Sequence, residues 1–314
     1  MTGDFENSRS QARRMPLICD KAMRLDAFIA SNFIRYSRNR IKEAVRNVRV
    51  NGKPVGKLSK LLSAGDSVEF ELDDRMLEKS SPECHSEPVD LDMVYEDDWL
   101  AVINKPQGVA VHHGNGHFSG TVEDALFCEL NKDRIDEMSA FRYGIVHRLD
   151  MDTSGLMVIA KTSLAAEHLI GEFKGRRVFK EYIALAEGHI AESEGTIVTG
   201  IRRSERNRLK FETCEQDEGK IAITEYNVLK YYADKATLLS LILKTGRTHQ
   251  IRVHLKSIGN PIMGDVLYGK PRNCGMTLML HAKRLGFHHP SGEYMEFDSD
   301  VPERFSNADR MLGG

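Results

Sequence analysis

The sequence has no long apolar run and no apolar leader. No hydrophobic stretch approaches the ~20 residues of a membrane-spanning helix, and the opening MTGDFENSRSQARRMPLICD lacks the apolar centre of a secretory signal. The 314 residues are 41% hydrophobic and 29% charged, as is typical of soluble globular proteins. We therefore expect a cytoplasmic protein without membrane spans, long enough for two domains.

Cysteine is scarce and scattered. The five cysteines form no C-x-x-C pair and are odd in number; they are Cys19, Cys84, Cys128, Cys214 and Cys274. This usage argues against a disulfide framework and against a cysteine zinc site. We expect the thiols to be reduced.

The usual cofactor and metal motifs are also missing. There is no G-x-x-x-x-G-K-[ST] sequence, and GNGHFSG at 114–120 is not followed by the acidic residue of a dinucleotide-binding unit. The histidines of VHHGNGH at 111–117, together with His147, His249 and His254, match no H-E-x-x-H or cysteine-assisted zinc pattern. We expect no metal and no cofactor, and a histidine-ligated metallohydrolase is the rival interpretation.

Charge is distributed unevenly along the chain. Residues 1–60 contain 14 Lys and Arg against 5 Asp and Glu, a net charge of +9, whereas residues 61–100 contain 2 against 13, a net charge of −11. The whole-chain net charge of −2 conceals this contrast. A basic head attracts polyanions such as RNA, although charge alone is equally compatible with an ordinary solvated surface.

The basic head has the pattern of a small domain. Apolar residues at helical spacing predict a first helix from about residue 25, and RNRIKEAVRN at 38–47 predicts a second. On that second helix Arg38, Lys42 and Arg46 fall at i, i+4 and i+8, which predicts one positive ridge. VRVNGKPV and AGDSVEFEL then predict strands around an Asn-Gly turn, with Val68 and Phe70 on one face.

This order of elements resembles the S4 RNA-binding domain. The run MRLDAFIASN…SRNRIKEAVRNVRVNGKPV carries the resemblance. We accordingly expect a disordered tail at 1–20, an S4-like RNA-binding domain at 21–75, an acidic Pro-containing linker at 76–91 and a large domain at 92–308. The ridge residues would then contact RNA.

Strands and helices alternate irregularly through the large domain. WLAVINKP at 99–106, EYIALAEG at 181–188 and LLSLILK at 238–244 predict strands, and SLAAEHLIGEFKG at 163–175 predicts an amphipathic helix. Between two apolar runs, IVHRLDMDTSGLMVIAKT at 145–162 places a polar loop that contains Asp150 and Asp152. A loop aspartate usually caps its own turn, but Asp150 is also a candidate nucleophile or base.

Four motifs together resemble the RluA-type RNA pseudouridine synthases. They are NKPQGVAVHHGNG, HRLDMDTSGLMVIAKT, KEYIALAEG and GRTHQIRVHLKSIGNPIMGD, and they occur in the order of that family. With the S4-like head, the chain resembles the large-subunit ribosomal RNA branch. The resemblance implies a mixed α/β, largely antiparallel catalytic domain with RNA across a basic cleft.

The resemblance also implies a reaction and a set of residues. The family converts uridine in RNA to pseudouridine: the N1–C1′ bond breaks, the uracil turns, and C5 joins C1′. The essential aspartate corresponds to Asp150, which acts either on the sugar or as a base at C2′. Tyr182 would pack on the flipped base and take the proton from C5, Arg252 would pair with the carboxylate, and Arg148 would hold the nucleotide.

Further contacts and partners follow as expectations. Substrate contacts are expected from His147, Arg247, His249 and Gln250, and from the VHHGNGH loop, whereas Asp152 is expected to serve only its turn. The expected partner is RNA, most of all large-subunit ribosomal RNA, and the expected state is a monomer. Transfer RNA is the alternative substrate, and a non-catalytic RNA-binding protein of ribosome assembly is the alternative function.

Overall fold

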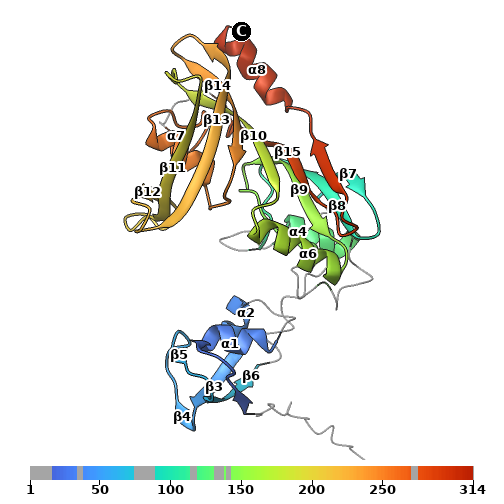
Figure 1. Cartoon of the computed structure of the whole chain (residues 1–314), viewed down its shortest axis with the longest axis vertical. Coiled ribbons are helices and arrows are strands. Elements are labelled where there is room, and N and C mark those ends of the chain that lie inside the picture. The colour runs from blue at the N-terminus through green and yellow to red at the C-terminus, as the bar shows by residue number, and fades with distance from the viewer. Residues whose placement is uncertain are drawn as a thin grey trace, which may run out of the picture. The chain divides into compact units, whose positions relative to one another are not determined.

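The chain folds as two compact units. The computed structural model describes residues 16–33, 38–73, 89–113, 119–130, 138, 143–269 and 275–313. One unit comprises residues 1–85 and the other residues 86–314, and both are drawn in Figure 1. Each unit has its own buried apolar core.

The N-terminal unit combines two short helices with two small sheets. The helices are α1 (Leu25–Ser31) and α2 (Arg38–Ala44). The strands are β1 (Leu17–Ile18), β2 (Met23–Arg24), β3 (Val45–Val50), β4 (Lys53–Pro54), β5 (Leu61–Leu62) and β6 (Ser67–Leu72). One sheet has the order β1-β6-β3-β4, and β2 pairs with β5.

The predicted hairpin of this unit is confirmed. Strands β3 and β4 pair antiparallel around Asn51 and Gly52, whose φ angles of 51° and 75° are those of a tight turn in the left-handed region. Val68 and Phe70 of β6 are buried, as their alternation predicts. The turn motif and the alternation of apolar residues were therefore sufficient to predict this part of the unit.

Two boundaries in this unit were predicted wrongly. Helix α2 ends at Ala44, and Arg46 lies on β3, so Arg38, Lys42 and Arg46 do not share one helix. The reason is the β-branched run of β3, in which Val45, Val48 and Val50 are buried while the strand pairs with β6. The expected tail is also too long, because β1 pairs with β6 and Cys19 is buried.

The large unit is built on a ten-stranded sheet of order β12-β11-β13-β14-β10-β15-β9-β8-β7, with β16 paired to β15 (Figure 1). Its strands are β7 (Asp92–Glu96), β8 (Leu100–Lys105), β9 (Ser154–Ala160), β10 (Phe179–Glu187), β11 (Glu194–Arg203), β12 (Phe211–Cys214), β13 (Lys220–Tyr232), β14 (Ala236–Leu243), β15 (Leu280–His288) and β16 (Tyr294–Asp298). All named pairs are antiparallel except β9 with β15. The sheet is therefore mixed and largely antiparallel, as expected.

The parallel contact between β9 and β15 depends on a glycine. Gly155 has a φ of +118°, and a Cβ atom there would lie 2.2 Å from the carbonyl oxygen of Ala282. Only glycine permits so close an approach of the two backbones. The polar loop that precedes β9 is thereby brought to the middle of the sheet, beside β15 and β10.

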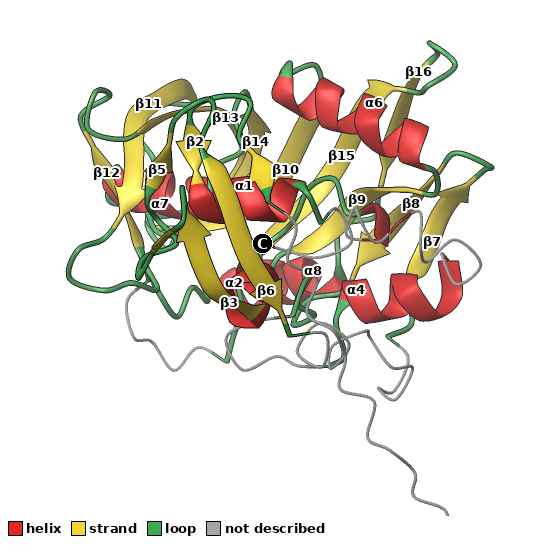
Figure 2. Ribbon diagram, turned by 90° about the horizontal axis from the view of Figure 1, so that it is seen from below, coloured by secondary structure: helices red, strands yellow, loops and turns green. Residues whose placement is uncertain are grey.

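Helices cover separate parts of this sheet (Figure 2). Helix α6 (Ser163–Lys174), which begins at the Thr162 cap, buries Ala165, Ala166 and Leu169 against the core of β8, β9 and β15. Helix α7 (Gln250–Ser257) packs near β11, β12 and β13. Helix α8 (Glu303–Leu312) and the short helices α4 (Val122–Ala125) and η1 (Leu126–Leu130) complete the unit.

Two further expectations can be compared with the structure. Within the described residues no helix is long and apolar enough to cross a membrane. Cys19 and Cys214 are free thiols, but Cys128 is disulfide-bonded, so the expectation that all thiols are reduced is wrong at Cys128.

Candidate active site

A cavity of about 580 Å³ lies where the polar loop before β9 meets β10 and the turn between β14 and α7. The loop contributes residues 146–150 and Thr153, and β10 contributes Lys180 and Tyr182. The turn contributes residues 243–252. Three segments far apart in the sequence therefore meet around one space, and it holds most of the candidate residues.

The centre of this cavity is a chain of three charges. The Nη1 atom of Arg252 donates to Oδ2 of Asp150 at 3.2 Å. Its Nε and Nη2 atoms donate to the two carboxylate oxygens of Asp265, each at 2.8 Å. The Asp265 side chain is fully buried and that of Arg252 is 4% exposed, whereas that of Asp150 is 18% exposed. Asp150 is thus the member of the chain that faces the cavity.

This arrangement holds Arg252 as a cation and Asp265 as an anion. Burial alone would raise the pKa of Asp265, but the hydrogen bonds and charge of Arg252 lower it below its usual value. Burial likewise opposes the charged form of Arg252, yet Asp265 and Asp150 raise its pKa. Arg252 therefore places a fixed positive charge 3.2 Å from the carboxylate of Asp150.

Lys105 holds the loop that carries Asp150 through hydrogen bonds to the backbone. This lysine, at the end of β8, is fully buried, and its Nζ donates to the carbonyl oxygens of Pro106, Val109 and Met151 at 2.9 to 3.0 Å. Burial lowers the pKa of Lys105 to about 8. All three N–H donors of the ammonium group are used. Lys105 therefore links the backbone of residues 106–109 to the backbone of the Asp150 loop.

The Asp150 loop is also a tight turn with its own hydrogen bonds. The Thr153 N–H donates to the carbonyl oxygen of Asp150 at 3.1 Å. The amide of Gln107 donates to the carbonyl oxygens of Asp152 and Leu278. Asp152 is therefore held through its backbone, and its side chain is not among those that line the cavity.

His249 approaches Asp150 from the turn before α7. Its Nε2 lies 3.9 Å from Oδ2 of Asp150, and its Nδ1 lies 2.8 Å from the hydroxyl of Tyr268. That hydroxyl also accepts the Phe211 N–H at 2.7 Å. Burial lowers the pKa of His249, and Asp150 partly opposes that shift.

His249 also has a backbone conformation that residues other than glycine rarely adopt. Its φ of 56° lies in the left-handed region, at the position that caps α7. Such conformations are retained where the surrounding structure fixes them, and they cluster at functional sites. The strained turn directs the ring of His249 at the carboxylate.

Tyr182 lines the cavity from the central strand β10. Its ring packs against two of the apolar clusters of the unit. Burial and the charge of Asp150 raise the pKa of its phenol, so the neutral form is favoured at physiological pH. An aromatic face beside an anionic group is a surface on which a nucleobase can stack.

Three residues that were expected to contact RNA, namely Gln250, Arg247 and His147, form hydrogen bonds within the protein. The Gln250 side chain accepts from Thr245 Oγ1 and the Arg247 N–H, and it donates to Ile223 O and Thr224 Oγ1. All of its hydrogen-bonding capacity is therefore used inside the protein. Arg247 donates through Nε to the Ile221 carbonyl.

His147 is likewise engaged. Its Nε2 accepts the Val158 N–H at 3.0 Å, and its ring stacks on Phe173 with centroids 4.5 Å apart. Burial lowers the pKa of His147 to about 3. It therefore lines the cavity as a neutral ring that ties the Asp150 loop to β9.

Cations surround the mouth of the cavity. Arg148 is exposed and lines it, and within the described residues no carboxylate lies at ion-pair distance from its side chain. Lys174, Arg176 and Lys180 line the same cavity, and burial lowers the pKa of Lys180 to about 8. A carboxylate inside a ring of cations suits an anionic substrate that must approach Asp150.

The remaining expected residues lie apart from this cavity. Lys42 and Arg46 belong to the N-terminal unit, and the side chain of Arg38 lies outside the described residues. In the VHHGNGH loop, His112 and His113 contact Glu123 and Asp124, while residues 114–117 are not described. Within the described part of the chain, no group of three or more His, Cys, Asp and Glu could hold a metal ion.

Asp265, Lys105 and Tyr268 were not singled out from the sequence. Asp265 ends the motif GRTHQIRVHLKSIGNPIMGD and Lys105 lies within NKPQG, so both were inside segments already recognised. An aspartate thirteen positions after an arginine has no local signature, because the ion pair forms only when α7 and the following turn fold together. A lysine inside an apolar strand pattern was the available signal for Lys105.

Comparison with known proteins agrees with this geometry. The family model of RNA pseudouridylate synthase matches residues 99–257. An uncharacterized RNA pseudouridine synthase of Bacillus subtilis is 39% identical over 287 residues, covering 90% of this chain and 92% of its own. The ribosomal large subunit pseudouridine synthase D of Borreliella burgdorferi is 36% identical over 304 residues, covering 94% and 91%.

Solved structures give the same result for the catalytic unit. Human RNA pseudouridylate synthase domain containing 1 is 31% identical, with a TM-score of 0.53 over 69% of this chain and 86% of its own. Human RNA pseudouridylate synthase domain containing 4 is 25% identical, with a TM-score of 0.56 over 70% and 92%.

Proposed function

The chain belongs to the RNA pseudouridine synthase family and is an enzyme that isomerises uridine in RNA; from this premise we propose its substrate, its residues and its division of labour. The substrate is large-subunit ribosomal RNA. Relatives from Borreliella, Neisseria and Yersinia that are 36 to 39% identical over about nine tenths of this chain are named ribosomal large subunit pseudouridine synthase D.

Asp150 is the essential carboxylate. The observation that supports this role is the charge chain, in which Asp265 and Arg252 are buried and Asp150 is the carboxylate that lines the cavity. Attack on C1′ and proton removal from C2′ both require an ionised carboxylate. Arg252 places a fixed cation 3.2 Å from this carboxylate, and Asp265 holds Arg252 in place.

The other residues position the uridine. A uridine must leave its stack to enter the cavity, at a cost of a few kcal/mol. Tyr182 offers its ring to the flipped base, and the exposed Arg148 holds the nucleotide at the mouth of the cavity. The raised pKa of Tyr182 supports stacking more directly than the removal of a proton from C5, because a base must first lose its own proton.

His249 and Arg247 complete the substrate contacts. The Nε2 atom of His249 lies 3.9 Å from the Asp150 carboxylate, on the side of the cavity where we place the ribose. His147 and Gln250, whose side chains are engaged inside the protein, act by holding the Asp150 loop and the turn before α7.

The N-terminal unit is an S4-like domain that delivers structured RNA. The order of its elements and its basic character support this role. Removing residues 1–85 should leave a folded catalytic unit that modifies structured ribosomal RNA poorly but still accepts short single strands. A truncated protein that modifies ribosomal RNA as fast as the whole chain would contradict this division.

The substrate is tested by mapping pseudouridine in RNA from cells that lack this chain. Reverse-transcription mapping should show the loss of one or more sites in large-subunit ribosomal RNA, and re-expression of the wild-type chain should restore them. Re-expression of an Asp150→Asn variant should not. Sites lost from transfer RNA alone would overturn the ribosomal assignment.

A further inference from the structure

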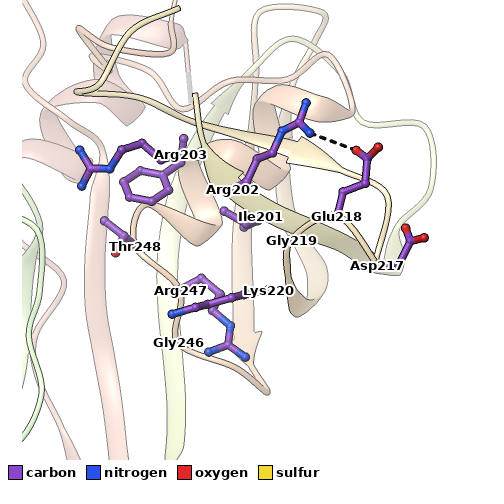
Figure 3. A pocket seen from close by; sticks show the side chains of 11 residues that line it. Ile201, Arg202, Arg203, Asp217, Glu218, Gly219, Lys220, Gly246, Arg247 and Thr248 are labelled. Atoms are coloured by element: carbon purple, nitrogen blue, oxygen red, sulfur yellow. Dashed lines mark hydrogen bonds and ion pairs between the residues drawn. The ribbon is translucent and has the colours of Figure 1, made fainter. Parts of the chain in front are cut away.

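A second cavity, of about 460 Å³, shares part of its lining with the first, and Figure 3 shows the side chains that line it. It is lined by the adjoining ends of β11 and β12, the turn before β13, and the turn before α7. Gly246, Arg247 and Thr248 line both cavities. The two spaces therefore share a wall, and a strand of RNA that enters one borders the other.

We propose that this second cavity binds the nucleotide next to the target uridine, with its phosphate on Arg247 and Lys220 and its base on Phe211 and Arg203. The inference rests on the proposed function and adds a subsite to it. Because adjacent nucleotides are covalently linked, a flipped uridine in the first cavity necessarily places a neighbour close by.

The two cavities are connected through His249. Its Nε2 lies 3.9 Å from the carboxylate of Asp150, and its ring meets that of Phe211 edge-on with centroids 5.5 Å apart. The Phe211 N–H and the His249 ring share the hydroxyl of Tyr268. A single ring thus separates the carboxylate from the proposed stacking surface.

The charges of the second cavity suit a phosphate. Its lining includes four cations, Arg202, Arg203, Lys220 and Arg247, against the carboxylates Asp217 and Glu218 (Figure 3). Arg202 is neutralised by Glu212 at 3.2 Å and Glu218 at 3.1 Å. Within the described residues, no carboxylate lies at ion-pair distance from the other three cations. Cations without carboxylate partners along a groove are typical contacts of an RNA backbone.

The same cavity offers a surface for a base. The guanidinium carbon of Arg203 lies 5.0 Å from the centre of the Phe211 ring. Arg203 is exposed and Phe211 is half-buried. Aromatic rings and arginine planes are the groups on which proteins stack unpaired RNA bases, and such stacking tolerates any base.

The test measures single-turnover isomerisation by the full-length protein. The substrate is a short RNA around a site mapped in ribosomal or transfer RNA, whichever the wild type modifies. Phe211→Leu and Arg203→Gln should each raise the half-saturating concentration about tenfold and leave the maximal rate within about twofold. The matched control is Arg206→Gln, an exposed arginine of the same hairpin that does not line the cavity. It should change either quantity by at most about twofold.

A second arm replaces one flanking nucleotide of the RNA by an abasic residue, on the 5′ side or the 3′ side of the target. On one of the two sides the wild type should lose about tenfold in half-saturating concentration. On that same abasic RNA, Phe211→Leu should raise the half-saturating concentration by less than about twofold relative to the wild type, because the base that would stack on Phe211 is already absent. Such non-additivity identifies a direct contact.

Three outcomes would overturn the inference. If Phe211→Leu lowers the maximal rate alone, Phe211 supports His249 and holds no nucleotide. If both abasic substrates cost the variant as much as the wild type, the base does not stack there. If the wild type modifies neither RNA, the proposed function fails and this inference fails with it.

Discussion

The two units each bury an aspartate against cations, but they do so in opposite arrangements. In the N-terminal unit the fully buried side chain of Asp26 meets Arg24 at 3.0 Å and Lys42 at 3.1 Å. The side chains of these cations are 48% and 37% exposed. There the anion is inside, and the cations reach it from the surface.

In the catalytic unit the cation is inside. Arg252 lies between Asp265, which is fully buried, and Asp150, which borders the cavity. Only Asp265 makes a two-point contact with the guanidinium, and Asp150 makes a single contact. Asp150 therefore keeps an oxygen for the cavity, whereas Asp26 presents no surface to a ligand. The difference explains how similar residues serve structure in one unit and chemistry in the other.

The largest expected effect is the loss of catalysis when Asp150, the most exposed member of the charge chain, is changed. Asp150→Asn keeps the shape of the side chain but removes its charge, so isomerisation should fall by ~10⁴-fold or more. The variant should fold and should bind RNA at least as tightly as the wild type, because a negative charge facing RNA is gone. Single-turnover conversion and filter binding measure the two quantities.

The matched control is Asp152→Asn. The side chain of Asp152 does not line the cavity, and its carbonyl oxygen, which the substitution retains, accepts from Gln107. Most activity should survive. An inactive Asp152→Asn beside an active Asp150→Asn would mean that the wrong carboxylate was chosen.

The next largest effect is on stability, at the buried end of the same chain. Asp265→Asn leaves the buried Arg252 with Asp150 as its one remaining carboxylate, which should cost about 3–5 kcal/mol of unfolding free energy. Urea denaturation measures the loss. Asp26→Asn should cost less, because Arg24 and Lys42 can return to water. Equal losses for the two variants would remove the distinction drawn between the clusters.

The sequence predicted local features well and tertiary ones poorly. The Asn-Gly turn, the alternation of β6 and the strands expected at 99–106, 181–188 and 238–244 follow from neighbouring residues, and they are confirmed. Asp150 and Arg252 are 102 positions apart, and their pairing, expected from the family resemblance, is present at 3.2 Å. Their catalytic roles are still proposals.

The failures have a common physical cause. Helical spacing extended α2 through Arg46, but the valines around it are better accommodated on β3, where the sheet buries them. Gln250 was expected to face RNA because it is polar, yet its four partners come from β13 and the turn before α7. Contacts between distant segments decide such cases, and no local pattern records them.

A third prediction uses pH, because neutral buried histidines occur in the catalytic unit and the described N-terminal residues contain no histidine. Burial lowers the pKa of His254 and of His281 to about 4. As pH falls below ~6.5 the unfolded chain binds protons first. The stability that these groups provide is therefore complete above that pH and is lost as pH falls toward 4, by up to about 1.4 kcal/mol per pH unit for each histidine.

His254 provides the control for this effect. Among the described residues, its ring forms hydrogen bonds only with the hydroxyls of Thr224 and Thr199, so His254→Asn removes a titrating group without removing an ion pair. Urea unfolding of the full-length chain between pH 6.5 and 5 should show a slope smaller by up to about 1.4 kcal/mol per pH unit. An unchanged slope would mean that His254 is protonated in the folded protein.

The smallest expected effect concerns the surface cations of the N-terminal unit. Lys42 is paired with Asp26, whereas the exposed Arg46 donates to the carbonyl oxygens of Glu43 and Val45 and keeps its full charge toward solvent. Arg46→Gln should therefore reduce the salt dependence of RNA binding by about 0.7–0.9 per lost phosphate contact, measured as log affinity against log salt concentration. Lys42→Gln should change this slope less, because its charge is already engaged, and should instead lower stability slightly by leaving Asp26 with one cation fewer. Activity on a short single-stranded RNA should stay the same in both variants. A larger slope change for Lys42→Gln than for Arg46→Gln would mean that RNA competes with Asp26 for the lysine, and that the cluster in this unit is a binding surface as well as a structural one.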